Sequence, residues 1–283
     1  MEYIIFICAM VAIYTIAAEG LNILVGLTGL TSVMQAAFLG LSAYIYALSA
    51  LKLGVPLGPS LLIALVGSAS AAYLLGYLTL RVRGDYFALI TFALAIIIYH
   101  SFNNLISITG GPMGVVNVPQ LLGSPRKFLL LVVLSAVASV FFVRLVGASP
   151  YGRLLKSIRE DEMLAASLGK NVQAVKMSAF IISSIFAGLA GVFYASYVTF
   201  IDPTSFAPME SIIILAMLLI GGAGSAVGPL LGALFLVAIP ELLRFLGLPG
   251  NVAAATRQLI FGLLMTVLMV FRPKGLIGEY RLY

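Results

Sequence analysis

Apolar runs of about 20 residues follow one another along this chain, and each is long enough to cross the ~30 Å hydrocarbon core of a bilayer as a helix. Only 9% of the residues are charged, against about 25% in soluble domains, and the mean hydropathy is +1.14. Backbone groups in lipid need partners within their own segment, and the alternation typical of barrel strands is absent. We therefore expect an all-α polytopic membrane protein with about eight transmembrane helices. The predicted spans are 3–25, 31–51, 58–80, 86–107, 127–147, 174–199, an interrupted segment at 210–243, and 257–271.

Basic residues cluster in three places between or after the predicted spans, and the positive-inside rule puts these places on the cytoplasmic side. This assignment also accounts for the net charge of +6 without a nucleic-acid partner. It predicts an outer N-terminus and a cytoplasmic C-terminus, with Lys52 and the Arg126–Lys127 pair as minor exceptions outside. The clusters are Arg81/Arg83, Arg153/Lys156/Arg159/Lys170/Lys176 and Arg272/Lys274/Arg281.

The parity of these spans requires segment 210–243 to enter and leave the membrane on the same side. Its first arm, 211–220, has ten apolar residues, about 15 Å as a helix, which is too short to cross alone. The interruption "GGAGSAVGP" at 221–229 is the natural turning point. We expect a broken or re-entrant helix pair here.

Glycine-rich interruptions also occur at 25–44 and in the outer stretch 103–119. In transporters, paired glycine-interrupted segments indicate discontinuous helices at a substrate site, whereas elsewhere small residues simply allow helices to pack closely. The outer stretch could be a pore mouth, a docking loop for an extracellular partner or a plain connection. The candidate residues of a substrate path are Gly26, Gly29, Ser32, Gln35, Phe38, Asn103, Asn104, Gly110, Gly111, Gly221, Gly222 and Gly224.

The chain lacks the motifs of the common enzyme and ATPase sites. There is no phosphate-binding loop of the G-x-x-x-x-G-K-[ST] type, no H-E-x-x-H and no G-x-S-x-G. One histidine and one cysteine exclude a metal cluster built from these residues. We therefore expect no enzymatic activity, no bound cofactor and no metal site, so that any energy source lies on another polypeptide.

Few ionisable residues fall within the predicted spans, although an ion-driven pump usually needs buried carboxylates or histidines. An ion-coupled secondary transporter or a channel remains the alternative of another class. The ionisable residues in question are Glu19, His100, Glu210, Glu241 and Arg244.

One polar segment, 148–173, interrupts this apolar chain. "ASPYGRLLKSIREDEMLAASLGKN" has a helix start at Ser149–Pro150 and a C-cap at Gly169, which predicts one amphipathic helix. The consecutive acids Glu160–Asp161–Glu162 argue against a helix lying on an anionic membrane surface, because an anionic leaflet repels them. Docking in the groove of a protein partner fits this mixture of both charge signs better.

Several stretches of the chain resemble the permease subunits of ABC importers for branched-chain amino acids, of the LivM type. They run in the order of that family and include "GLTGLTSVMQAAFLGLSAY" (26–44), "NNLISITGGPMGV" (103–115), "YGRLLKSIREDEMLAASLGKNV" (151–172), "GGAGSAVGPLLGAL" (221–234) and "RQLIFGLLMTVLMVFRPKGLIG" (257–278). One departure is Gln35, which stands where a histidine is frequent in the family.

The resemblance implies one permease domain over 1–283, in the plasma (inner) membrane of a bacterium or archaeon. Its partners would be a second permease of the LivH type, two cytoplasmic ATPase subunits of the LivG/LivF type that bind ATP and Mg²⁺, and a periplasmic substrate-binding protein. Permeases for urea or short amides are the alternative within this class. Segment 148–173 would couple transport to the ATPases through Gly152, Arg153, Arg159, Glu160, Asp161, Glu162, Ala165, Ala166 and Gly169.

Overall fold

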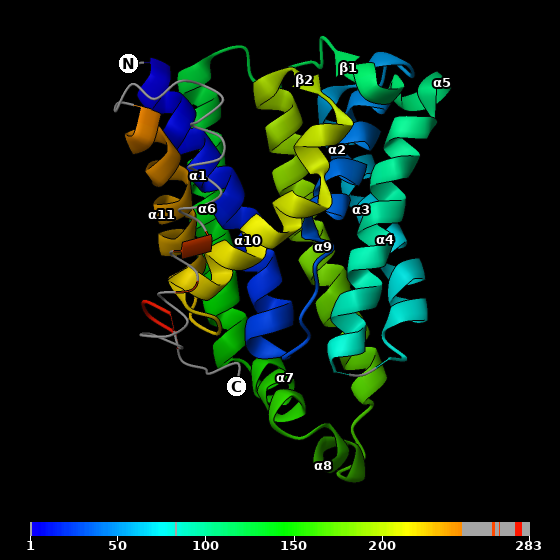
Figure 1. The fold of residues 1–283 in the computed structure, drawn as a ribbon, viewed down its shortest axis with the longest axis vertical. Helices are drawn as coiled ribbons and strands as arrows, with labels where there is room; N and C mark the ends of the chain where they lie inside the picture. The colour runs from blue at the N-terminus through cyan, green and yellow to red at the C-terminus, as the bar shows by residue number, and fades with distance from the viewer. Residues whose placement is uncertain (1, 83, 245–261, 264–265, 267–274, 279–283) are drawn as a thin grey trace.

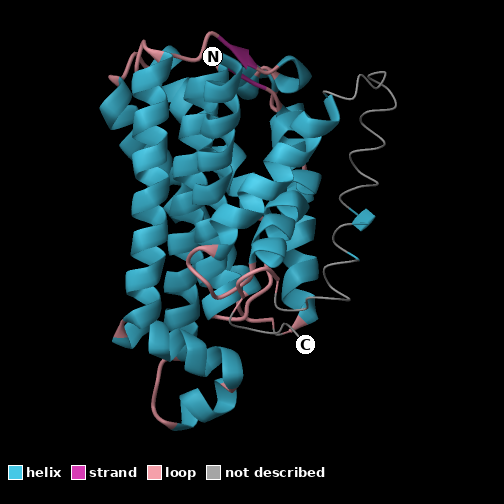
Figure 2. Cartoon of the chain, turned by 90° about the vertical axis from the view of Figure 1, so that its left-hand side faces the viewer, coloured by secondary structure: helices cyan, strands magenta, loops and turns pink. Residues whose placement is uncertain are grey.

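Long apolar helices run side by side and form a bundle, with two short helices extending beyond one of its ends (Figure 1, Figure 2). The structure, a computed structural model, describes residues 2–82, 84–244, 262–263, 266 and 275–278. The elements are α1 (Glu2–Leu21), η1 (Asn22–Leu27), α2 (Gln35–Leu51), α3 (Leu57–Thr79), α4 (Asp85–Asn104), α5 (Ile106–Thr109), η2 (Gly111–Met113), β1 (Val115–Val116), α6 (Pro125–Ala148), α7 (Pro150–Glu160), α8 (Glu162–Ser167), α9 (Val172–Val198), β2 (Phe200–Ile201), η3 (Pro203–Phe206), α10 (Pro208–Gly221) and α11 (Gly228–Arg244).

Five helices in the described part of the chain are long and apolar enough to cross a membrane. They are the helix Tyr3–Leu27, which combines α1 and η1, and helices α3, α4, α6 and α9. The predicted span 31–51 is shorter than expected, because its helix begins only at Gln35. The predicted span 257–271 lies outside the described residues except at 262–263 and 266, as do the basic residues Arg272, Lys274 and Arg281.

Burial divides the long helices into central and peripheral ones. We compared the most apolar 18-residue window of each helix. In this window, 67% of the residues of the first helix and 56% of those of α9 are buried, against 22% in each of α3, α4 and α6. Helix α2 packs against both α9 and α3. Apolar side chains such as Leu62, Leu89 and Leu134 are exposed on the three peripheral helices, as expected of surfaces that face lipid.

Small residues bring the backbones of α2, α3 and α9 close together. A Cβ atom on Gly191 would lie 2.1 Å from the Leu39 carbonyl oxygen, so only glycine fits there. The Ser68 hydroxyl on α3 donates to the Ser184 carbonyl on α9 over 2.8 Å. These contacts follow the small-residue packing that is common between membrane helices.

The N-terminus, the 108–126 loop and the 199–207 loop lie at one end of the bundle, and α7 and α8 lie at the other (Figure 1). At the N-terminal end, β1 pairs with β2 in antiparallel fashion, with Val115 opposite Ile201. The Lys52 ammonium donates to the Ser107 and Ile108 carbonyls, both over 3.0 Å. The stretch 103–119 is therefore an ordered cap rather than an open loop.

Asp202 stabilises the turn that follows β2 in this cap. Burial alone would raise the pKa of its carboxyl, but hydrogen bonds from Ser205 and Thr204 outweigh burial and lower the pKa. The ionised carboxylate thus accepts from both hydroxyls and holds η3 next to the start of α10.

Helices α10 and α11 pack against each other as a hairpin, with a turn at residues 222–227 between them. Helix α10 runs obliquely into the middle of the bundle, and α11 returns toward the N-terminal end (Figure 1). This hairpin is the broken helix pair that the sequence predicts for segment 210–243. It arises because α10 ends after 14 residues at Gly221, where Gly222 has a φ of 116° that disfavours other residues.

Segment 148–173 forms two helices instead of the single helix that the sequence predicts. Asp161 has an extended backbone, and its carboxylate accepts a 2.9 Å hydrogen bond from the Leu164 amide, so it ends α7 and caps α8. The predicted boundaries agree with the structure: Ser149 caps α7 by accepting from the Gly152 amide, and Gly169 has a left-handed φ of 76° after α8.

Candidate functional site: a helix break joined to the polar segment

The first membrane helix is interrupted before α2 begins. Helix α1 widens into the π-helical turn η1, and residues 28–34 form no helix. Gly29 takes a left-handed φ of 76° and donates to the Val25 carbonyl, while the Thr28 hydroxyl donates to the Ile23 carbonyl over 2.9 Å. We call residues 22–34 the helix break. For the glycine-interrupted segment 25–44, the sequence left a discontinuous helix and close helix packing as alternatives, and the structure shows helical residues ending at Leu27 and resuming at Gln35.

Asn22, a fully buried amide, joins the helix break to the 222–227 turn. Its Nδ2 donates to the Ser225 carbonyl over 2.8 Å, and its Oδ1 accepts from the Gly224 amide over 2.9 Å. One side chain thus satisfies both a donor and an acceptor of the turn backbone, which is otherwise outside any helix, as membrane proteins require. The two glycine-interrupted segments, whose bonded residues lie 202 and 203 positions apart in the sequence, therefore meet in space.

Gly26 makes this close approach sterically possible. A Cβ atom there would lie 2.1 Å from Asn22 Oδ1 and 2.5 Å from the Gly224 amide nitrogen. Real Cβ atoms do not approach other atoms so closely, so alanine cannot occupy this position without moving the turn.

Arg159 of α7 reaches the helix break from the polar segment. Its Nη1 donates to the Gly26 carbonyl over 2.6 Å, and Glu160 holds Nη2 at 2.9 Å. The Arg159 side chain is only 10% exposed, and its Cγ would lie 2.7 Å from a Cβ atom on Gly29. The last carbonyls of η1 lack helical partners because the helix ends here. The Arg159 guanidinium supplies the missing donor for one of them, the Gly26 carbonyl.

The start of α2 and the end of α10 complete the surroundings of the helix break. The Ser211 hydroxyl on α10 accepts from the Ala36 amide over 2.9 Å and so caps α2. At the other end of α10, the Ile220 and Gly221 carbonyls accept from the amides of Leu276 and Ile277 over 2.9 and 3.0 Å. The described residues 275–278 thus close over the end of α10.

The structure separates the twelve candidate path residues into three groups. Gly26, Gly29, Ser32, Gly221, Gly222 and Gly224 lie in the helix break, at the end of α10 and in the adjoining turn. Gln35 and Phe38 lie on α2, where Phe38 packs edge-on against Phe180 at 5.5 Å. Asn103, Asn104, Gly110 and Gly111 lie at the opposite, N-terminal end of the bundle.

Gln35 is fully engaged in buried hydrogen bonds between helices. Its Nε2 donates to the Ala17 carbonyl over 2.8 Å and to the Ser183 carbonyl over 3.3 Å, and its Oε1 accepts from the Ser183 hydroxyl over 3.2 Å. These bonds hold α1, α2 and α9 together at the first turn of α2. Among the described residues, Gln35 therefore has a clear role in joining helices.

Glu19 lies one turn before Asn22 and is fully buried. The polar side chain that stabilises its carboxylate is Asn22, although the two do not meet in standard hydrogen-bond geometry. Glu19 is therefore a buried acidic side chain beside the helix break whose interaction is with Asn22.

Helices α7 and α8 are anchored on one face and exposed on the other. The Lys176 ammonium binds the Glu162 carboxylate at 2.6 Å, and the hydroxyls of Tyr151 and Ser178 share a 2.6 Å hydrogen bond. Most of the predicted coupling residues lie at the surface, while Gly152 and Ala165 are buried in the anchored face. The exposed face carries apolar side chains that no described residue covers: Met163, Leu164 and Leu168 are 73%, 59% and 71% exposed.

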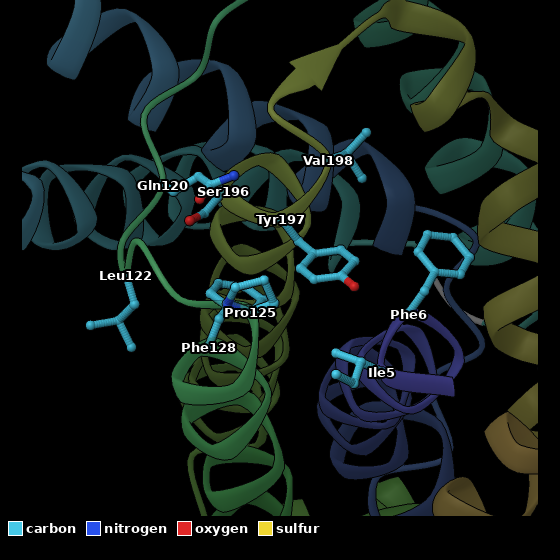
Figure 3. Close-up of a pocket in the computed structure, with 9 residues that line it drawn as sticks. All are labelled: Ile5, Phe6, Gln120, Leu122, Pro125, Phe128, Ser196, Tyr197 and Val198. Carbon is cyan, nitrogen blue, oxygen red and sulfur yellow. The ribbon is translucent and has the colours of Figure 1, made fainter. Parts of the chain in front are cut away.

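A cavity of about 430 Å³ lies at the N-terminal end, between α1, α6 and α9 (Figure 3). The Tyr197 ring lies between Phe6 and Phe128, with ring centroids 6.0 and 5.2 Å away, and Gln120 and Ser196 add polar groups (Figure 3). Its volume falls in the range of about 300–1,000 Å³ that is usual for small-molecule sites.

Sequence reasoning missed three parts of this site: Asn22, the Ser225 carbonyl and the closing segment 275–278. Asn22 gave a signal, because an amide inside an apolar run is costly unless a partner satisfies it. The backbone partners gave none, since a carbonyl or an amide is present at every residue.

Comparisons with known proteins find permeases of import systems. Residues 3–270 match the family described as "Branched-chain amino acid transport system / permease component". The high-affinity branched-chain amino acid transport system permease protein LivM of Salmonella typhimurium is 35% identical over 304 residues, which cover 97% of this chain and 70% of the relative. LivM of Escherichia coli K12 is 34% identical with the same coverage. A probable LivM of Methanocaldococcus jannaschii is 27% identical over 70% of this chain and 61% of its own. No solved structure matches the chain.

Proposed function

Because the chain belongs to the family of branched-chain amino acid transport permeases, we propose that it is the membrane-spanning subunit of an ABC importer for leucine, isoleucine, valine or related apolar amino acids. The importer would lie in the plasma membrane of a bacterium or archaeon. Its other subunits would be a second permease of the LivH type, two ATPases of the LivG/LivF type that hold ATP and Mg²⁺, and a periplasmic binding protein.

The contact between Arg159 and Gly26 is the observation that carries the mechanism. The exposed face of α7 and α8 would dock in a groove of the ATPase, with Met163, Leu164 and Leu168 as apolar contacts. Closure of the ATPases on ATP would then move α7. Since the Arg159 guanidinium holds the Gly26 carbonyl at 2.6 Å, this movement pulls on the helix break and, through Asn22, on the 222–227 turn.

The 430 Å³ cavity at the opposite end supports import of apolar amino acids. Aromatic rings suit a branched aliphatic side chain, and Gln120 and Ser196 can meet polar backbone groups. In this proposal, the cavity receives the solute from the binding protein, and the helix break opens the path on the other side.

Uptake measurements test the proposed substrate class. We expect proteoliposomes with the complete importer and its binding protein to accumulate radiolabelled leucine only with ATP, and excess isoleucine and valine to compete. Urea and acetamide would leave leucine uptake unchanged. ATP-dependent uptake of urea, with no uptake of leucine, would contradict the branched-chain assignment and leave the ABC permease class intact.

Cysteine labelling tests the orientation. In a Cys8→Ala background, we expect a membrane-impermeant maleimide to label Thr204→Cys in intact cells and Ser157→Cys only in inverted vesicles, because both positions are exposed at opposite ends of the bundle. The opposite result would be labelling of Ser157→Cys in intact cells and of Thr204→Cys only in inverted vesicles. It would place α7 and α8 outside the cell and exclude their docking on a cytoplasmic ATPase.

A further inference from the structure

The ring of Phe206 fills a slot between helices α2, α4 and α9. Phe206 belongs to η3 and is buried. Its ring centroid lies 5.7 Å from that of Tyr194 on α9 and 6.1 Å from that of Tyr44 on α2, and the Tyr44 ring lies 4.7 Å from Phe102 on α4. Gly40 of α2 makes room for the ring, because a Cβ atom there would lie 2.7 Å from it. We call the space bounded by Gly40, Tyr44, Phe102 and Tyr194 the ring slot.

The hydroxyl of Tyr44 is a buried polar group that the fold does not satisfy. The Tyr44 side chain is 3% exposed, and its hydroxyl has no hydrogen-bond partner among the described residues. Nearly all buried polar atoms in folded proteins have such a partner. Tyr46, two residues further along α2, shows the usual arrangement, because its hydroxyl donates to the Pro119 carbonyl over 3.0 Å. The Tyr44 hydroxyl therefore marks a position where a ligand can supply the missing hydrogen bond.

The charged group that acts on the Tyr44 hydroxyl is the carboxylate of Asp202, the residue that precedes η3. This carboxylate accepts hydrogen bonds from Thr204 and Ser205, and no described lysine or arginine forms a salt bridge with it. A carboxylate and the faces of aromatic rings both attract a cation. The ring slot and Asp202 together thus favour a ligand that combines an ammonium group with an apolar side chain.

The ring slot lies between the two ends of the proposed path. Tyr44 is about 14 Å along α2 from Gln35, the first residue after the helix break. In the other direction α2 ends at Leu51, next to Lys52, which binds the cap. Helix α10 begins directly after η3 and runs to the 222–227 turn (Figure 1). A solute that moves along α2 from the cap to the helix break passes this slot.

We propose that the ring slot is a solute-binding position, which the chain's own Phe206 ring occupies in this structure. The apolar side chain of the solute replaces that ring, and the solute's ammonium donates to the Tyr44 hydroxyl and the Asp202 carboxylate. The identity of the solute as leucine, isoleucine or valine rests on the proposed function. The slot is distinct from the 430 Å³ cavity, whose lining includes none of its residues.

Ligand binding to the purified Phe206→Ala chain tests the slot, with thermal unfolding in detergent as the readout. This variant should have a lower Tm than the native chain, because it leaves the slot unfilled. Isoamylamine keeps the ammonium and the branched chain of leucine, whereas isocaproate keeps the branched chain and the carboxylate. We expect leucine and isoamylamine to restore part of the Tm, and isocaproate to bind at least about tenfold more weakly. Equal effects of isoamylamine and isocaproate, or no effect of either, would overturn the proposal.

Tyr44→Phe in the assembled importer tests the hydroxyl by itself, and it decides as well if Phe206→Ala does not fold. The change removes an unsatisfied hydroxyl, so the Tm should stay the same or rise, while ATP-dependent leucine uptake should fall about fivefold. Tyr46→Phe is the matched control on the same helix. It removes the bond to the Pro119 carbonyl, so the Tm should fall while uptake per folded importer stays near the native value.

Failure of the site and failure of the proposed function give different results. Native uptake by Tyr44→Phe would overturn the site and leave leucine import intact. A native importer without leucine uptake, whose Phe206→Ala chain still prefers isoamylamine to isocaproate, would contradict the proposed function and retain the site.

Discussion

Replacing Arg159 by alanine is expected to reduce leucine uptake by the assembled importer about tenfold or more while ATP hydrolysis continues. The guanidinium donates to the Gly26 carbonyl from a side chain that is 10% exposed. A hydrogen bond to a charged group of this kind contributes about 1.5–3 kcal/mol, which corresponds to roughly ten- to a hundredfold in an equilibrium constant. Without it, the ATPases move α7 but the helix break no longer follows. The measurement is the ratio of leucine transported to ATP hydrolysed in proteoliposomes.

Arg81→Ala is the matched control for this variant. Arg81 lies at the same end of the bundle, where its guanidinium stacks over the Tyr77 ring at 4.5 Å, and it makes no contact with the helix break in the described structure. Its uptake should remain near the native value. If Arg159→Ala retained the native ratio of transport to hydrolysis, the contact with Gly26 would have no part in coupling.

Replacing Gly26 by alanine is expected to lower the thermal stability of the protein and to abolish uptake. Helix propensity alone predicts a gain of about 1 kcal/mol from this change. The added Cβ would however lie 2.1 Å from Asn22 Oδ1 and 2.5 Å from the Gly224 amide, and overpacking typically costs about 1–3 kcal/mol. The added methyl group would also separate Asn22 from the 222–227 turn and break their hydrogen bonds. Each buried polar group left without a partner lowers the stability by about 1–3 kcal/mol. The clash therefore outweighs the propensity gain.

Gly58→Ala serves as the control, since a Cβ atom there meets nothing within 4 Å and the residue also lies in a helix, α3. Thermal unfolding followed by circular dichroism should show a higher or unchanged Tm for this variant and a lower Tm for Gly26→Ala. A Gly26→Ala protein as stable and active as the native one would mean that Asn22 and the 222–227 turn do not need their close contact.

The features that the sequence predicted correctly are those set by local composition. The length of an apolar run decides whether it can span a bilayer, and the glycines at 26–29 and 221–224 end helices because of their own backbone freedom. The caps at Ser149 and Gly169 are likewise local signals. For this reason the helical class, the two interruptions and the limits of the polar segment agree with the structure.

The contacts that join these features depend on distant parts of the chain. Arg159 binds a carbonyl 133 positions away, and Asn22 binds a turn 202 positions away. The local sequence does not distinguish Arg159 from Arg153 or Lys156. The contact of Arg159 with the helix break is set by the packing of α7 against η1, which the sequence alone does not show. The division of the polar segment at Asp161 had a local signal, because aspartate is a preferred N-cap residue. Asp161 stands between Glu160 and Glu162, however, and the three acids were interpreted together as one charged patch of a single helix.

The account depends most on the transmission of movement from α7 to the 222–227 turn, and spin-label distances measure it directly. In the assembled importer with a Cys8→Ala background, one pair would join Lys127→Cys to Ser157→Cys on α7, and the other would join Lys127→Cys to Val227→Cys, all at exposed positions. We predict that ATP binding changes both distances in the native sequence, and that in Arg159→Ala it changes only the distance to residue 157. A distance to residue 227 that still changes with ATP in Arg159→Ala would contradict the account.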